Sequence, residues 1–111
     1  MKRNAFNLLI FSIYIFIGGE NIDSLFLEAN TLYQKGDYNQ AIKSYESLLE
    51  QDIDNSILYY NMANAYYNLD QLGHARLYYE RAKLYDFNDS DVNYNLNTLE
   101  QRLIDDVLVV P

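Results

Sequence analysis

Few side chains in this sequence have the type and spacing that catalysis or metal binding requires. The chain of 111 residues contains no cysteine and a single histidine, His74, which excludes cysteine nucleophiles, disulfides and metal sites built from several thiolates or imidazoles. Asp105 and Asp106 form a carboxylate pair, but they lie in a tail for which no pocket is expected. Glycine-rich phosphate loops and nucleophile-elbow motifs are absent from the sequence. We therefore predict a protein that is not an enzyme and that uses no metal or cofactor.

The segment DFNDSD (86–91) resembles the start of a calcium-binding loop because oxygen ligands occupy alternating positions. The pattern fails further on, since Asp91 stands where glycine is needed and Asn97 where a bidentate glutamate is needed. We interpret the segment as a turn between two helices, with Ser90 or Asp91 capping the helix that follows.

Paired tyrosines and interspersed asparagines are the remaining candidates, and their chemistry is binding. They are concentrated in YYNMANAYYNLDQLGHARLYYERA (59–82), where small residues recur between the rings. A tyrosine has few torsions to immobilise and combines an apolar ring with a hydrogen-bonding hydroxyl, which suits a binding surface. The alternative is that these tyrosines only coat a small domain.

An internal period of 34 residues organises these side chains. Ala29 and Ala63 are 34 positions apart, and the same offset relates further pairs: Asn30 with Asn64, Tyr33 with Tyr67, Ala41 with Ala75, Tyr45 with Tyr79 and Glu46 with Glu80. A period in this range is typical of a solenoid, in which each unit buries its apolar face against the next.

Helical periodicity divides each unit into two helices joined by a turn, at Lys35-Gly36-Asp37 in the first unit and around Asp70 to Gly73 in the second. The apolar stripes are Leu25, Ala29, Leu32; Tyr38, Ala41, Tyr45, Leu48; Tyr59, Met62, Ala63, Tyr66; Leu72, Ala75, Tyr79, Ala82; and, in a fifth helix, Val92, Leu96, Leu99, Leu103. Small residues are needed where helix axes approach, so the four repeated alanines are expected to act as spacers.

This small-large register with its 34-residue period resembles the tetratricopeptide repeat. The resemblance implies an all-α solenoid of antiparallel helix pairs, with two full repeats plus a capping helix, preceded by an apolar N-terminal segment. The expected parts are residues 1–19, a signal peptide or signal anchor; 22–55 and 56–89, the two repeats; 90–104, the first helix of a third repeat; and 105–111, a tail.

The same resemblance implies a groove on the concave surface that binds a segment of a partner protein. The residues it places there are Phe26, Asn30, Tyr33, Tyr60, Asn64, Tyr67, Tyr94 and Thr98. In co-chaperones with this repeat, paired asparagines and several cations clamp an acidic peptide terminus. Asn30 and Asn64 match the asparagines, but Phe26, Tyr94 and Thr98 stand where cations are required. A segment with apolar and amide groups is therefore the expected ligand.

The N-terminal segment predicts export. Lys2 and Arg3 precede an apolar run of 13 residues, 5–17, which has the length of a signal-peptide core and is shorter than a transmembrane helix. An uncleaved anchor and a buried N-terminal helix are the alternatives. The whole chain carries a formal charge of −8, and the part after Gly19 carries −10 because the segment contains two cations and no acid. Nucleic acid and membrane headgroups are poor partners for that surface, so membrane contact is expected only through the segment itself.

A narrower resemblance concerns YYNMANAYYNLDQLGHARLYYERAKLYDFNDSDVNYNL (59–96) and the tail DDVLVVP (105–111). Together with the export segment, they resemble, in shortened form, the exported tetratricopeptide protein of bacterial aerotolerance (Bat) operons. This implies a non-catalytic scaffold in the periplasm or on the inner membrane facing it, with partners that carry von Willebrand factor A domains. An exposed end at Leu103 to Val110 suggests self-association. The alternative function is a membrane-tethered spacer without a specific ligand.

Overall fold

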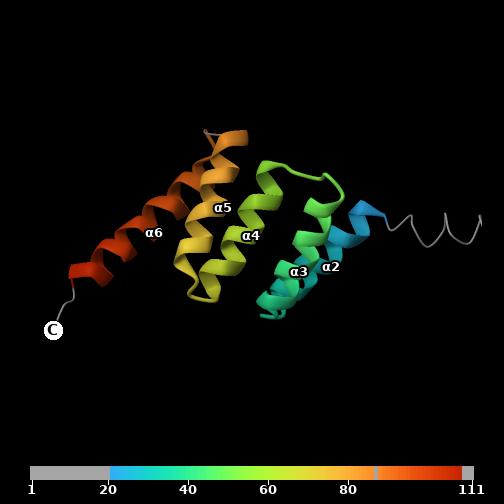
Figure 1. Cartoon of the computed structure of the whole chain (residues 1–111), viewed down its shortest axis with the longest axis horizontal. Helices are drawn as coiled ribbons and strands as arrows, with labels where there is room; N and C mark the ends of the chain where they lie inside the picture. The colour runs from blue at the N-terminus through green and yellow to red at the C-terminus, as the bar shows by residue number, and fades with distance from the viewer. Residues whose placement is uncertain (1–20, 87, 109–111) are drawn as a thin grey trace, which may run out of the picture.

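Helices account for nearly all of the part that the structure describes. The computed structural model describes residues 21–86 and 88–108, and in these ranges it contains five helices and no strand: α2 (Ile22–Gln34), α3 (Tyr38–Glu50), α4 (Ser56–Asn68), α5 (Leu72–Tyr85) and α6 (Ser90–Leu108). The helices stack side by side in chain order, and α6 ends the row (Figure 1). The predicted all-α class is confirmed. The predicted signal segment, residues 1–19, lies outside the described residues.

Each first helix of a unit begins at a capping side chain, and these caps recur at the repeat period. The Oδ1 atom of Asn21 accepts a hydrogen bond from the backbone of Asp23 at 3.1 Å, and that of Asn55 accepts one from Leu58 at 2.8 Å. At the third position Asp89 accepts bonds from the backbone amides of Asp91 and Val92. Caps of this kind satisfy amides that have no partner within the helix. The prediction that Ser90 or Asp91 caps the last helix is therefore wrong, and the cap is one residue earlier.

The turns between the helices of a unit depend on a residue in the left-handed conformation. Gly36 has φ 81° and Asp70, 34 positions later, has φ 62°. The next residue in this series is Ile104, whose β-branched side chain makes positive φ costly. The chain does not turn there, and α6 continues to Leu108. The helix predicted for 90–104 is thus longer, and residues 105–108 of the predicted tail are helical.

The core forms where the repeated alanines let helices approach. Ala29, Ala41, Ala63 and Ala75 are fully buried, at 0% exposure. Large side chains fill the space around them, including Tyr45, Leu48, Leu58, Met62, Tyr79, Val92 and Leu99. Among the described residues no charged or polar side chain other than tyrosine is buried in this core. The predicted role of the alanines as spacers is confirmed.

A row of aromatic rings runs along the junction of α4 and α5. From one end to the other, the rings belong to His74, Tyr66, Tyr78, Tyr59 and Tyr85. Successive ring centroids are 5.0 to 6.0 Å apart, and the guanidinium carbon of Arg81 lies 5.0 Å from the ring centre of Tyr78. These distances are typical of favourable ring stacking and cation–π contact. His74, the only histidine, is therefore an exposed member of a structural stack.

Candidate functional site

The first helices of the three units, α2, α4 and α6, share one face that carries a run of four concavities. Their volumes, in order along the face, are about 430, 280, 270 and 480 Å³. We call this surface the first-helix face. Its lining residues include Phe26, Leu27, Asn30, Tyr33, Ile57, Asn61, Asn64, Tyr67, Asn68, Tyr94, Asn95, Thr98 and Arg102. Seven of the eight predicted groove residues are in this set, and Tyr60 contributes through a hydrogen bond described below.

A hydrogen-bonded set of amides and hydroxyls forms the floor of the first-helix face between α2 and α4. The Oδ1 atom of Asn30 accepts a hydrogen bond from the Tyr45 hydroxyl at 2.6 Å and one from Nδ2 of Asn61 at 3.4 Å. Nδ2 of Asn68 donates to the Tyr33 hydroxyl at 3.0 Å. Side chains from α2, α3 and α4 are thus joined across the repeat boundary.

The same arrangement recurs one unit later, between α4 and α6. The Oδ1 atom of Asn64 accepts hydrogen bonds from the Tyr79 hydroxyl and, at 3.1 Å, from Nδ2 of Asn95. Asn95 also donates to the Tyr60 hydroxyl at 3.2 Å. Because Oδ1 of Asn30 and Asn64 is occupied in this way, the amide groups are held in a fixed orientation. Their Nδ2 atoms, which offer two donors each, make no hydrogen bond to another described residue.

The tyrosines beneath this floor remain protonated well above neutral pH. Burial, with a smaller effect from the neighbouring Tyr33, raises the pKa of Tyr45 to about 12. Burial likewise raises the pKa of Tyr79, although the Asn95 side chain opposes the shift. Both hydroxyls therefore stay available as donors to Asn30 and Asn64.

The outer residues of the first-helix face are more accessible. Tyr94 is 71% exposed, and the Thr98 hydroxyl donates to the backbone carbonyl of Tyr94 at 3.0 Å. Phe26 and Tyr33 are half-buried, and the Tyr33 ring meets that of Tyr38 edge-on at 5.2 Å. Tyr67 is half-buried as well, with the guanidinium of Arg102 5.4 Å from its ring centre.

Several residues of the first-helix face were not predicted from the sequence. Asn61 and Asn95 carry the amide contacts between units, and their separation of 34 residues was the signal that identifies them. Leu27 and Ile57 make one end of the face apolar, since they are 68% and 67% exposed beside the same concavity. No periodic pattern marks these two residues. The residue 34 positions after Leu27 is Asn61, and the residues 34 positions before and after Ile57 are aspartates.

The middle of the first-helix face contains no cation. The two central concavities are lined by asparagine, glutamine, tyrosine and threonine side chains. Arg102 lies at the α6 end, where its guanidinium pairs with Asp70. Its pKa is raised, first by the interaction with Tyr67. The several cations that an acidic peptide terminus requires are thus lacking from the two central concavities.

In the described ranges, no group of acidic and histidine side chains is arranged to hold a metal ion. None of the helices there is both long and apolar enough to span a membrane.

Comparisons with known proteins identify the repeat. A model described as TPR repeat matches residues 29–70, and one described as tetratricopeptide repeat matches residues 57–89. The chain contains tetratricopeptide repeats. Among solved structures, the first TPR of Spaghetti (RPAP3) bound to the HSP90 peptide SRMEEVD is similar over 73% of this chain and 91% of its own, at 21% identity and a TM-score of 0.37. No curated protein sequence matches the chain. The first-helix face is therefore carried by TPR units, with α6 as their terminal helix.

Proposed function

We propose that this TPR module binds an extended segment of a partner protein along the first-helix face. The observation that carries the proposal is the pair of oriented amides, Asn30 and Asn64, which line consecutive concavities of this face. Each has its Oδ1 atom held by a buried tyrosine, which leaves Nδ2 to donate to the backbone carbonyls of a bound chain. Little orientational freedom is lost on binding, because the amides are already fixed.

The charge of the first-helix face defines the chemistry of the partner segment. Its centre offers hydroxyl and amide groups, and Leu27 and Ile57 provide an apolar contact surface at one end. A bound carboxylate would lose its hydration without gaining a cation in the centre. The segment that fits is therefore uncharged along its middle, with an apolar side chain directed toward Leu27 and Ile57.

We place this binding in a bacterial cell envelope, in an aerotolerance-type complex. Support for this comes from the sequence of residues 1–19, which has the charge and length of an export signal. The partners proposed on the narrower resemblance are envelope proteins with von Willebrand factor A domains.

Photo-crosslinking tests the proposal directly. A photoreactive phenylalanine analogue replaces Tyr94, which is 71% exposed on the first-helix face, or Leu84, which is 84% exposed on α5. The proteins are expressed in a bacterium that carries the native gene neighbourhood, irradiated and purified, and the crosslinked peptides are sequenced. We expect one defined partner segment, uncharged in its middle, at the Tyr94 position and not at the Leu84 position.

A structural spacer gives the opposite result. In that case the two positions yield the same unspecific crosslinks or none. A third protein with the probe at Tyr94 and Asn64→Asp separates the cases further, because this change keeps an oxygen acceptor for Tyr79 and Asn95 while it removes the Nδ2 donor. Once circular dichroism has verified that this variant is folded, a lower crosslinked yield identifies the face as the binding surface. Replacing Tyr60 or Tyr67 is less informative, since Tyr60 accepts a hydrogen bond from Asn95 and Tyr67 contacts Arg102 within the fold.

A further inference from the structure

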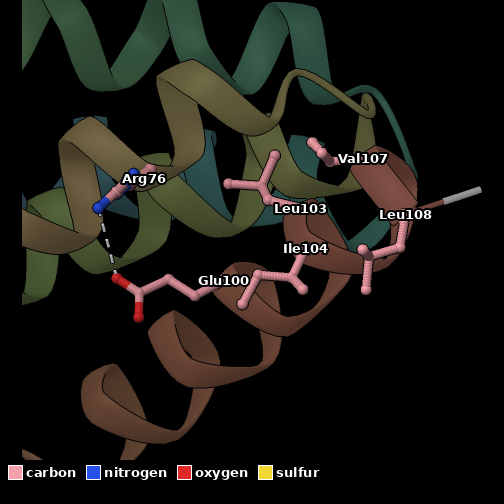
Figure 2. Close-up of a pocket in the computed structure, with 6 residues that line it drawn as sticks. All are labelled: Arg76, Glu100, Leu103, Ile104, Val107 and Leu108. Carbon is pink, nitrogen blue, oxygen red and sulfur yellow. Dashed lines mark ion pairs between the residues drawn. The ribbon is translucent and has the colours of Figure 1, made fainter.

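A second, apolar groove lies between α5 and the end of α6, away from the first-helix face. It has a volume of about 440 Å³, and Figure 2 shows its lining residues: Arg76 on α5, and Glu100, Leu103, Ile104, Val107 and Leu108 on α6. Three of the apolar side chains are largely in solvent, with Ile104 52%, Val107 71% and Leu108 74% exposed. Exposed apolar side chains gathered in this way are typical of contact surfaces.

The groove exists because the third unit lacks its turn. In the preceding unit, α5 packs at the corresponding position. Leu72 at the start of α5 belongs to one apolar cluster with Ile42 and Tyr66. In the third unit Ile104 replaces the left-handed turn residue, so α6 continues without a turn and no described helix packs at that position. The groove is thus a helix-binding site of the repeat without a described helix in it.

The groove beside α6 differs in two ways from the surface that packs with α5 in the preceding unit. Ala63 and Tyr66, which belong to the cluster that packs with α5, correspond at the 34-residue offset to Asn97 and Glu100. These polar residues disfavour another tetratricopeptide helix in the same place, because its apolar stripe would meet an amide and a carboxylate. The apolar contact is displaced toward the last two turns of α6.

The α6 residues of the groove follow the spacing of one helix face, which is suited to packing against another helix. We call this set the stripe; it consists of Glu100, Leu103, Ile104, Val107 and Leu108. The charges beside the stripe are balanced. Glu100 and Arg76 form an ion pair at 3.6 Å. On a helix of 3.6 residues per turn, Asp105 and Asp106 lie about 130° from the centre of the stripe, one on each side of it. A helix that binds here need not bury an unpaired charge.

We propose that the occupant is α6 of a second copy of this chain, packed antiparallel to the first in a two-fold symmetric dimer. In such a pair the same stripe lies on both sides, with Ile104 next to its symmetry mate and Leu108 above the partner's paired Glu100 and Arg76. The stripe fulfils the self-complementarity that an isologous contact requires. The two charged residues in the groove lining, Glu100 and Arg76, neutralise each other, so two copies of a chain with net charge −8 meet there on a surface without net charge.

The contact is small. It consists of one helix stripe per copy, whereas stable interfaces bury roughly 1,200–2,000 Å². We therefore expect a dimer in the micromolar range or weaker, in exchange with the monomer. The proposal is independent of partner binding, because the stripe and the first-helix face do not share a lining residue.

Disulfide crosslinking of the full chain tests the dimer, and the absence of cysteine from the sequence makes it specific. A disulfide forms only when two Cβ atoms come within about 3.5–4.5 Å. In Ile104→Cys the two thiols lie at the two-fold axis, and in the matched control Leu84→Cys an exposed thiol lies on α5, away from the groove. Under mild oxidation we expect at least about tenfold more crosslinked dimer from Ile104→Cys than from Leu84→Cys.

Adding Val107→Asp to Ile104→Cys places a charge in the stripe and is expected to lower the crosslinked fraction to the level of Leu84→Cys. Circular dichroism verifies that each variant is still helical, which the exposure of these positions favours. Equal crosslinking of Ile104→Cys and Leu84→Cys would overturn the proposal, and so would a disulfide with a different protein or a yield that Val107→Asp leaves unchanged. Association through residues 1–19 is common to all variants and cannot produce the difference.

Discussion

Asn30 and Asn64 each have two tasks, because the carbonyl oxygen of the side chain maintains the fold while the amide nitrogen is left for the groove. Asn64 shows this most clearly, since its Oδ1 atom accepts hydrogen bonds from both Tyr79 and Asn95. Removing it leaves a buried hydroxyl without its acceptor. A buried polar group without a partner costs more than a hydrogen bond contributes.

Asn64→Ala is therefore expected to lower the free energy of unfolding by about 1–3 kcal/mol. Asn97→Ala, at an exposed position of α6, is the matched control and is expected to change it by no more than about 0.5 kcal/mol. Urea denaturation of both variants measures the difference. Similar losses in both would show that the Asn64 contacts contribute nothing special.

The buried hydroxyls also predict a pH dependence of stability. The pKa of Tyr45 is raised to about 12 in the folded chain, whereas a tyrosine in the unfolded chain ionises near 10. The folded state thus holds the proton more tightly, so the stabilisation is complete below about pH 10 and is lost as the pH rises from about 10 to 12. Tyr45→Phe is expected to flatten this alkaline loss of stability. Urea denaturation at several pH values between neutral and alkaline measures the free energy of unfolding of both proteins. An equally steep fall of this free energy with pH in Tyr45→Phe would contradict the assignment.

At the level of helices and turns, two glycines with opposite roles provide a test. Gly36 has φ 81°, and a Cβ atom added there would contact nothing, so the cost of Gly36→Ala is purely conformational. We expect a loss of about 1–2 kcal/mol. Gly73 lies in α5 with equally open surroundings, and Gly73→Ala is expected to stabilise by roughly 0.4–1 kcal/mol. Thermal unfolding of both variants decides the matter, since shifts of the same sign would be inconsistent with these backbone roles.

The elements show why part of the structure follows from sequence patterns and part does not. The alanine spacing and the ring positions determine which faces pack, so the helices and the core were predictable from the period of 34. The end of α6 was not, because it depends on whether Ile104 adopts a left-handed turn, and periodicity alone does not report backbone strain. The amide contacts of Asn61 and Asn95 were missed for a related reason, since which of two neighbouring asparagines donates and which accepts depends on helix stacking.

For the whole molecule, the uncharged centre of the first-helix face predicts how binding responds to salt. Binding through an ion pair weakens as salt screens the charges, whereas amide and apolar contacts are little affected. With the partner segment that crosslinking identifies, we expect raising the salt from about 0.05 to 0.5 M to change Kd by less than about threefold. Calorimetry or fluorescence anisotropy measures this. A steep loss of affinity would point to a cationic site and against the asparagine floor.

The row of rings along α4 and α5 has an optical consequence. The chain contains no tryptophan and 12 tyrosines, so its intrinsic ultraviolet emission comes from tyrosine alone. Rings whose centroids are 5 to 6 Å apart exchange excitation energy before they emit. Light emitted by the folded protein is therefore depolarised, and its near-ultraviolet dichroism carries the signature of coupled chromophores. Separation of α4 from α5 weakens both signals, which makes the native protein a label-free reporter of its own repeat packing.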